Sequence, residues 1–106
     1  GLSENLEMLN LEYNKFSIID SNYFENLNSL RFLYLGSNKI STIKFHSFEK
    51  LKNLQKLYLN DNCLFNLDSR IFINLNKLVY LNLAQNELVK LKPEWFINIY
   101  NLKELY

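Results

Sequence analysis

The sequence predicts a solenoid in which every turn adds one short strand to a parallel β-sheet. Three observations predict it: a fixed period of 24 residues, a pair of leucines separated by one residue in each period, and an asparagine shortly after each pair. A fixed period in the twenties is typical of a solenoid, because one turn alone cannot bury its apolar face. With 106 residues, 48% of them hydrophobic, the chain is long enough for one domain of this kind.

The repeat is clearest at its start. Its copies read LEMLNLEYN from Leu6, LRFLYLGSN from Leu30, LQKLYLNDN from Leu54 and LVYLNLAQN from Leu78, with a partial fifth copy, LKELY, from Leu102. Each copy begins 24 residues after the one before it, without insertion or deletion. We therefore expect one domain over residues 1–106, made of about four complete repeats.

Each leucine pair predicts a strand. In Leu57, Tyr58 and Leu59, the leucines point to one side and the tyrosine to the other, because side chains alternate across a strand. Strands of this kind are expected at Met8–Asn10, Phe32–Tyr34, Lys56–Tyr58 and Tyr80–Asn82. The rest of each repeat is long enough for the crossover that a parallel sheet requires. It carries a column of phenylalanines that we expect in the core: Phe24, Phe48, Phe72 and Phe96.

An asparagine follows each predicted strand, where the chain has to turn away from the sheet. These residues are Asn14, Asn38, Asn62 and Asn86. A buried amide side chain can both donate to and accept from the backbone of adjacent turns. The column therefore predicts a structural ladder of hydrogen bonds rather than a ligand site.

This pattern resembles the leucine-rich repeat, in the 24-residue form LxxLxLxxNxLxxLxxxxFxxLxx of extracellular proteins such as Toll-like receptors, Slit proteins and insect leucine-rich immune proteins. The resemblance covers essentially the whole chain from about Leu6. It implies an α/β-type leucine-rich repeat solenoid, a right-handed superhelix with a parallel concave β-sheet and a largely irregular convex side. It also implies an extracellular or cell-surface location, although the seventeen asparagines supply no N-x-[ST] sequon and a cytoplasmic location stays open.

Extracellular members of this class usually carry cysteine-rich caps at both ends, and the sequence contains a single cysteine. The last residue, Tyr106, falls within a predicted strand. We therefore expect the chain to be a fragment of a longer array that lacks its caps.

Charge and motifs exclude several classes of function. Twelve basic and eleven acidic residues occur without a long run of like charge, so no nucleic-acid partner is predicted. The cations near the strand entrances could form a modest basic edge, but ordinary solvated side chains are the favoured interpretation: Arg31, Lys52, Lys77 and Lys103. No apolar run is long enough for membrane insertion by this segment.

An enzymatic role is not predicted. One histidine, His46, and one cysteine, Cys63, cannot supply a usual zinc site, and neither a GxGxxG nor a GxxxxGK[ST] motif is present. We expect no cofactor and no metal. His46 is expected at the surface. Cys63 is expected near the surface at a strand exit, either inert or bonded to another chain.

The outward face of the sheet is the candidate binding surface, since the concave faces of solenoids commonly bind partners. Aromatic residues gather in two neighbouring columns of this face and are flanked by charged and polar side chains. The candidate partner-binding residues are Phe32, Tyr34, Lys56, Tyr58, Asp61, Tyr80, Asn82 and Tyr106. The alternative is that aromatic residues simply favour strands and stack across them.

Two functions follow from this surface. The first is a protein–protein recognition module, part of a receptor or of a secreted immune-type ectodomain, that binds a protein partner through the concave sheet. The second is a structural or assembly scaffold, in which these repeats only extend an array and binding is carried by other repeats.

Overall fold

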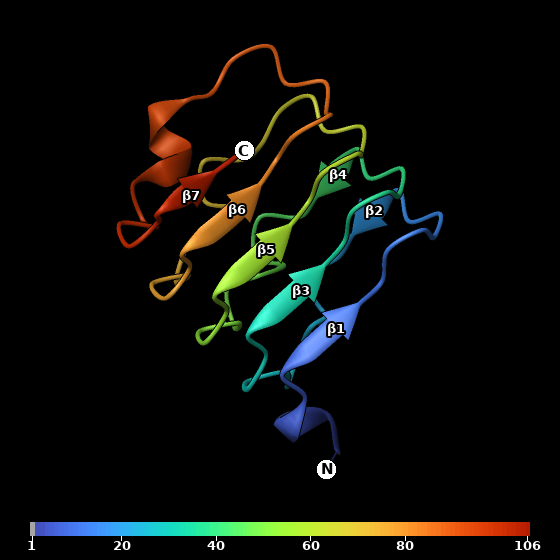
Figure 1. Ribbon diagram of the computed structural model, residues 1–106, viewed down its shortest axis with the longest axis vertical. Coiled ribbons are helices and arrows are strands. Elements are labelled where there is room, and N and C mark those ends of the chain that lie inside the picture. Colours follow the sequence, from blue (N-terminus) through green and yellow to red (C-terminus); the bar gives the residue numbers. More distant parts are fainter. Residues whose placement is uncertain (1) are drawn as a thin grey trace.

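The computed structural model, which describes residues 2–106, has a strand at each predicted position. These strands are β1 (Met8–Asn10), β3 (Phe32–Tyr34), β5 (Lys56–Tyr58) and β6 (Tyr80–Asn82), followed by β7 (Glu104–Leu105). They form one parallel sheet in the order β1-β3-β5-β6-β7, and Figure 1 shows them as successive steps of a solenoid. Paired residues are 24 apart, as in Leu33 and Leu57, so each turn repeats the register of the last.

The leucine pairs face the core, as predicted. Leu57 and Leu59 are fully buried, whereas Tyr58 between them is only half-buried on the opposite face of the sheet. Backbone hydrogen bonds to the next turn continue beyond the strand end, for example from Leu35 N to Tyr58 O at 2.8 Å. The alternation of the strand therefore separates core residues from outward residues in every turn.

The convex side is largely irregular, but it contains a second, two-stranded sheet that the sequence analysis did not predict. β2 (Ile18–Ile19) and β4 (Thr42–Ile43) pair in parallel. Both segments consist of β-branched residues, which favour strands. The equivalent residues of the next two turns are Asn66–Leu67 and Lys90–Leu91, which lack β-branched residues, and no strand forms there.

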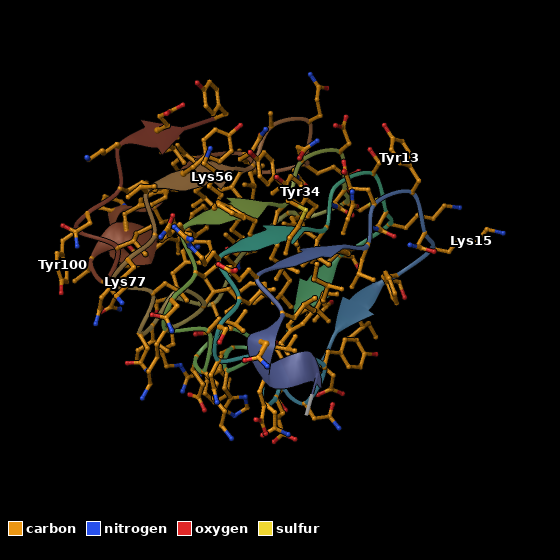
Figure 2. The ribbon with its side chains drawn as sticks, turned by 60° about the horizontal axis from the view of Figure 1, so that its bottom comes forward. Tyr13, Lys15, Tyr34, Lys56, Lys77 and Tyr100 are labelled. Atoms are coloured by element: carbon orange, nitrogen blue, oxygen red, sulfur yellow. The ribbon has the colours of Figure 1, made fainter. Side chains whose placement is uncertain are left out.

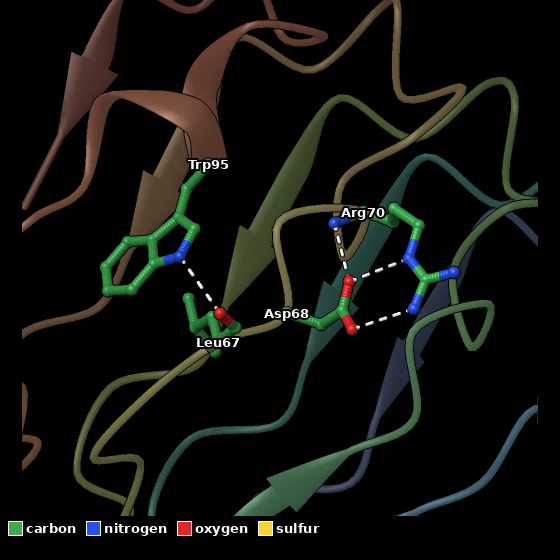
Figure 3. Close-up of polar contacts among 4 residues, drawn as sticks. All are labelled: Leu67, Asp68, Arg70 and Trp95. Carbon is green, nitrogen blue, oxygen red and sulfur yellow. Dashed lines mark hydrogen bonds and ion pairs between the residues drawn. The ribbon is translucent and has the colours of Figure 1, made fainter.

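Regular helix is confined to two short 3-10 segments within residues 2–106, η1 (Leu2–Asn5) and η2 (Pro93–Phe96). The second one changes the core of the last turn. Phe24, Phe48 and Phe72 are buried as expected, but Phe96 is only partly buried and Trp95 lies in the core instead. Its indole Nε1 donates to Leu67 O at 3.0 Å, as Figure 3 shows.

The predicted asparagine ladder is confirmed for three of its four residues, Asn38, Asn62 and Asn86. Asn62 Oδ1 accepts from Ile40 N at 3.0 Å in the preceding turn, and Nδ2 lies 3.0–3.1 Å from three backbone carbonyls, one of them in that preceding turn. Asn38 and Asn86 repeat this arrangement. Asn14 is exposed and bonds only within its own turn, to Leu11 O and Glu12 O. The amides thus tie successive turns together.

The residue before each ladder asparagine has a left-handed backbone conformation. These residues are Tyr13, Ser37, Asp61 and Gln85, with φ between 55° and 59°. The conformation turns the chain away from the sheet, and it is costly for residues other than glycine. Gly36, beside one of them, has no positive φ, but a Cβ at this position would lie 2.9 Å from Asn60 Oδ1 in the next turn, so a larger residue would require the Asn60 side chain to move.

Candidate functional site

All candidate residues except Asp61 occupy two adjacent columns on the outward face of the sheet. Tyr34, Tyr58 and Asn82 share one register column, while Phe32, Lys56, Tyr80 and Glu104 share the other. Figure 2 shows Tyr34 and Lys56 on this face, with Tyr13 and Lys15 at the strand exits and Lys77 and Tyr100 toward the strand entrances. The position of each of these side chains on the face is determined by the register of its strand.

Four tyrosines form a continuous stack across the face. The ring centroids of Tyr34 and Tyr58 are 4.5 Å apart with nearly parallel planes at 13°. Tyr58 and Tyr80 are 4.7 Å apart, and Tyr80 and Tyr106 are 5.4 Å apart, with the planes tilted by 38° and 41°. Each contact lies within the range in which aromatic pairs attract one another.

Tyr80 enters this stack from the other column. In its turn, the position equivalent to Tyr58 is Asn82, whose smaller side chain leaves room for the ring of Tyr80 to lean across. Asn82 Nδ2 donates to Tyr80 Oη at 3.4 Å. The sequence predicted that these residues lie together, but not that a ring from one column would continue the stack of the other.

Phe32 is separate from the stack. Within residues 2–106, its ring pairs with none of the tyrosines, and the Arg31 guanidinium lies 5.7 Å from its centroid. Lys56 Nζ is 5.7 Å from the centroid of Tyr80, at cation–π distance. The aromatic residues of the two columns therefore form four stacked tyrosines, with Phe32 and Lys56 beside them.

The other two candidates lie at the margins. Asp61 is exposed at the exit of β5 and accepts from Asn60 Nδ2 at 2.8 Å. Tyr106 is 58% exposed, and its hydroxyl donates to Glu104 Oε2 at 3.1 Å. This hydrogen bond raises the pKa of Tyr106, and burial together with the neighbouring phenols Tyr34 and Tyr80 raises the pKa of Tyr58. Both phenols therefore stay neutral hydrogen-bond donors at physiological pH.

The strand-entrance edge holds a polar hollow of about 500 Å³, and its cations have partners. Arg31 Nη1 is 3.3 Å from Glu7 Oε1, and Lys77 Nζ donates to Asn53 Oδ1 at 2.8 Å. Asn53 and Asn101 each donate from Nδ2 to a backbone carbonyl of the preceding turn, at 2.6 and 2.7 Å. The edge thus has a second set of structural amides, which sequence reasoning missed because they lie outside the framework columns.

His46 is half-buried on the convex side, less exposed than the sequence suggested. Its ring centroid is 3.7 Å from that of Phe45, and Nδ1 is buried with no hydrogen-bond partner in the described part of the chain. The Arg70 guanidinium lies 3.7 Å over Phe45 and also pairs with Asp68 (Figure 3), which lowers the pKa of Asp68 to about 2. Cys63 is a half-buried free thiol.

Within residues 2–106, no three metal-ligating side chains come together, and no helix has the length and apolar character needed to cross a membrane. The outward sheet face carries the stacked tyrosines and the charged side chains beside them. Its chemistry is that of ring edges, phenolic hydroxyls and single charges.

Known proteins share this architecture. TLR13 in the TLR13–ssRNA13 complex superimposes with a TM-score of 0.85 at 30% identity, over 91% of this chain and 13% of TLR13. Toll in the Toll–Spatzle complex of Drosophila, described as a hub in development and innate immunity, gives 0.86 at 28% identity, over 92% of this chain and 13% of Toll. No curated protein sequence matches.

The chain thus spans about an eighth of the length of these two solved chains. The family model described as leucine rich repeat matches residues 3–40, 33–88 and 52–106, which together cover nearly all of the sequence. Proteins of this family are generally binding modules rather than enzymes. The protein belongs to the leucine-rich repeat family.

Proposed function

We propose that this chain is a recognition module that binds a protein partner through the outward, concave face of its sheet. One observation carries the proposal: four tyrosines stack in a continuous row on a face that contributes nothing to the leucine core. Tyrosine is enriched at the centres of interfaces, where it provides a large and rigid contact area. The contact residues are those of the two columns, with Phe32, Lys56 and Asp61 around the stack.

A protein partner is favoured over a nucleic acid by the way the rings are arranged. Single-stranded nucleic acids bind by stacking bases on open aromatic faces and by phosphate contacts to cations. Tyr58 and Tyr80 each already contact the rings of two neighbouring tyrosines, so they offer less open ring surface to a base. The face also balances Lys56 against Glu104, so it offers no basic track. TLR13 nevertheless forms a complex with ssRNA13, and Toll with Spatzle, so both classes enter the test.

The two solved neighbours support an extracellular or cell-surface receptor setting, and these repeats would form one segment of such an ectodomain array. The alternative is a scaffold role, in which the repeats set the spacing of an array while other repeats bind. The two proposals differ in one respect that can be measured: only the first makes the tyrosines energetically important for binding.

The test compares binding of the chain to secreted proteins of its source organism and to a single-stranded RNA oligonucleotide. Tyr58→Ala is expected to weaken binding of a protein ligand by about 1 kcal/mol or more, which is roughly fivefold. His46→Ala, on the convex side, serves as the control and is expected to leave the Kd unchanged. Thermal melts of both variants establish that the comparison is made between folded chains.

Two results would contradict the proposal. If Tyr58→Ala and Tyr34→Ala both leave protein binding unchanged, the scaffold role is the better explanation. If instead the RNA binds, and its affinity falls steeply with salt while the proteins do not bind, the partner class is wrong.

A further inference from the structure

The tyrosine stack contains one pair whose geometry differs from the others. Tyr34 and Tyr58 are direct register partners on neighbouring parallel strands, so their side chains leave the sheet at equivalent points. Their rings are nearly parallel, at 13°, with centroids 4.5 Å apart. Equivalent atoms of the two rings therefore face each other, including the Cε carbons next to the hydroxyls.

The other two ring contacts lack this correspondence. Tyr80 comes from the neighbouring column, so it meets Tyr58 and Tyr106 diagonally, with plane angles of 38° and 41°. These contacts nonetheless connect the pair to Tyr106, which is 58% exposed at the end of the row. An oxidising equivalent received at Tyr106 could reach Tyr34 through three ring contacts of 5.4, 4.7 and 4.5 Å.

From this geometry we propose that Tyr34 and Tyr58 are an oxidative modification site. A haem peroxidase, with hydrogen peroxide as the oxidant, would join the two rings there as dityrosine. Each phenol loses one hydrogen atom to the oxidised haem, which leaves two phenoxyl radicals. The radicals couple through one Cε of each ring. The two Cε hydrogens then move to the oxygens and restore both phenols, while the peroxide is reduced to two waters.

The product would be a covalent link between the turns that carry β3 and β5. It would hold two successive turns at a fixed separation and would remove two ring edges from the outward face. The inference rests on ring geometry alone, so it does not depend on the proposed recognition function.

The experiment oxidises the folded chain at low concentration with a haem peroxidase and hydrogen peroxide, and maps the products by mass spectrometry after trypsin digestion. Tyr34 lies in the peptide of residues 32–39 and Tyr58 in that of residues 57–70. The expected main product is these two peptides joined with the loss of two hydrogens, recovered from monomeric protein. A Cys63→Ser background is run in parallel, because the half-buried thiol can reduce phenoxyl radicals.

Tyr34→Phe is the decisive variant, since it keeps the stacked ring but removes the phenol. It is expected to abolish the product joining residues 32–39 and 57–70. Tyr13→Phe is the matched control, because Tyr13 is more exposed, at 81%, but stacks on no ring in the described part of the chain. This variant should leave the product unchanged.

If solvent exposure decides which tyrosines react, the cross-links should form at Tyr13 or Tyr100; if proximity of the rings decides, they should join Tyr34 to Tyr58. Cross-links confined to dimers, at Tyr13 or Tyr100, would show that exposure decides the reaction and would overturn the proposal. So would an equal yield of the internal link from the urea-unfolded chain, because the folded register is what brings the two rings together.

Discussion

The two sides of this solenoid are made from the same 24-residue period, but only one of them repeats its structure. On the sheet side, each turn forms a strand in the same register as the last. On the convex side, the first two turns pair through β2 and β4, the third has no strand, and the fourth forms η2.

The difference lies in how buried backbone groups are satisfied. In the sheet, the backbone groups of every turn are satisfied in the same way, by the parallel hydrogen-bond ladder, which requires the same conformation in each turn. The convex side uses several: Ile19 O accepts from Lys44 N at 3.0 Å and from the Ser47 hydroxyl at 3.3 Å, whereas Leu67 O accepts from the Trp95 indole. A side chain can take the place of a strand there, so the backbone of the convex side differs from turn to turn, whereas that of the sheet side does not.

The largest effect is expected from Leu57→Ala, which removes a fully buried side chain from the sheet side of the core. The free energy of unfolding should fall by about 2–5 kcal/mol in urea denaturation, through lost transfer energy and the cavity left behind. Thr42→Ala, an exposed change in β4, is the convex control and should stay within about 0.5 kcal/mol of the wild type. Similar losses for both would break the distinction between the two sides.

Asn62→Ala tests the ladder at the boundary of the sheet. It deprives Ile40 N of its acceptor and several buried carbonyls of a donor, so we expect a loss of roughly 1–3 kcal/mol. Asn60→Ala, two residues earlier, removes an amide that bonds only Asp61 and should cost less. Equal melting temperatures for the two variants would contradict the structural role of the ladder.

Trp95→Phe tests whether a side chain really stands in for a strand on the convex side. The change keeps an aromatic ring in the core but leaves Leu67 O without the indole donor, at an expected cost of about 1–2 kcal/mol. Ser47→Ala, which removes the smaller hydroxyl donor to Ile19 O, should cost less, because that carbonyl keeps its bond from Lys44 N. The reverse order in chemical denaturation would refute this explanation.

Gln85→Gly should stabilise the chain slightly. Gln85 has φ 56°, a conformation that costs about 1–2 kcal/mol for residues with a Cβ, and the greater freedom of glycine in the unfolded state returns part of that gain. A net increase of up to about 1 kcal/mol is expected. Ala84→Gly, at the preceding residue without a positive φ, should instead destabilise by about 0.5–1 kcal/mol. The same sign for both would exclude backbone strain as the cause.

The smallest effect concerns pH and the convex surface. Arg70 lowers the pKa of Asp68 from 3.8 to about 2, so the carboxylate stabilises the fold fully above pH ~4, and this stability is lost as the pH falls through about 2. Both side chains are at least a third exposed, so screening keeps the contribution below about 1 kcal/mol. Asp68→Asn should therefore lower the melting temperature near neutral pH, by an amount that shrinks as the pH falls through about 2. A pH-independent difference would rule out the ion pair.

The sheet side could be predicted from the sequence because its requirements recur in the same columns. Leu57 and Leu59 show the strand, and Asn62 shows the turn after it. The convex side could not be predicted in the same way. Trp95 and Ser47 perform the same task with unrelated side chains, so no column reveals it. Their partners are backbone carbonyls, which leave no trace in the sequence.

Within the candidate site, too, some features could be predicted from the sequence and others could not. Its residues could be predicted from strand alternation, because register alone places Tyr34 beside Tyr58. The way in which Tyr80 leans over Asn82 could not be predicted. It depends on the absence of an aromatic ring at position 82 and on its presence at position 80. Likewise, nothing in the spacing indicates that Phe32 would pair with Arg31 rather than join the stack.

The close approach of Gly36 and Asn60 has a consequence for how these repeats can change over generations. A Cβ at position 36 would lie 2.9 Å from Asn60 Oδ1, so a larger residue there requires the Asn60 side chain to move or a smaller residue to replace it. A larger residue at position 60 in turn favours glycine at position 36. We therefore expect the effects of mutations at the two sites to depend on each other, so that the order in which they arrive influences which sequences can be reached, although the positions lie in different repeats.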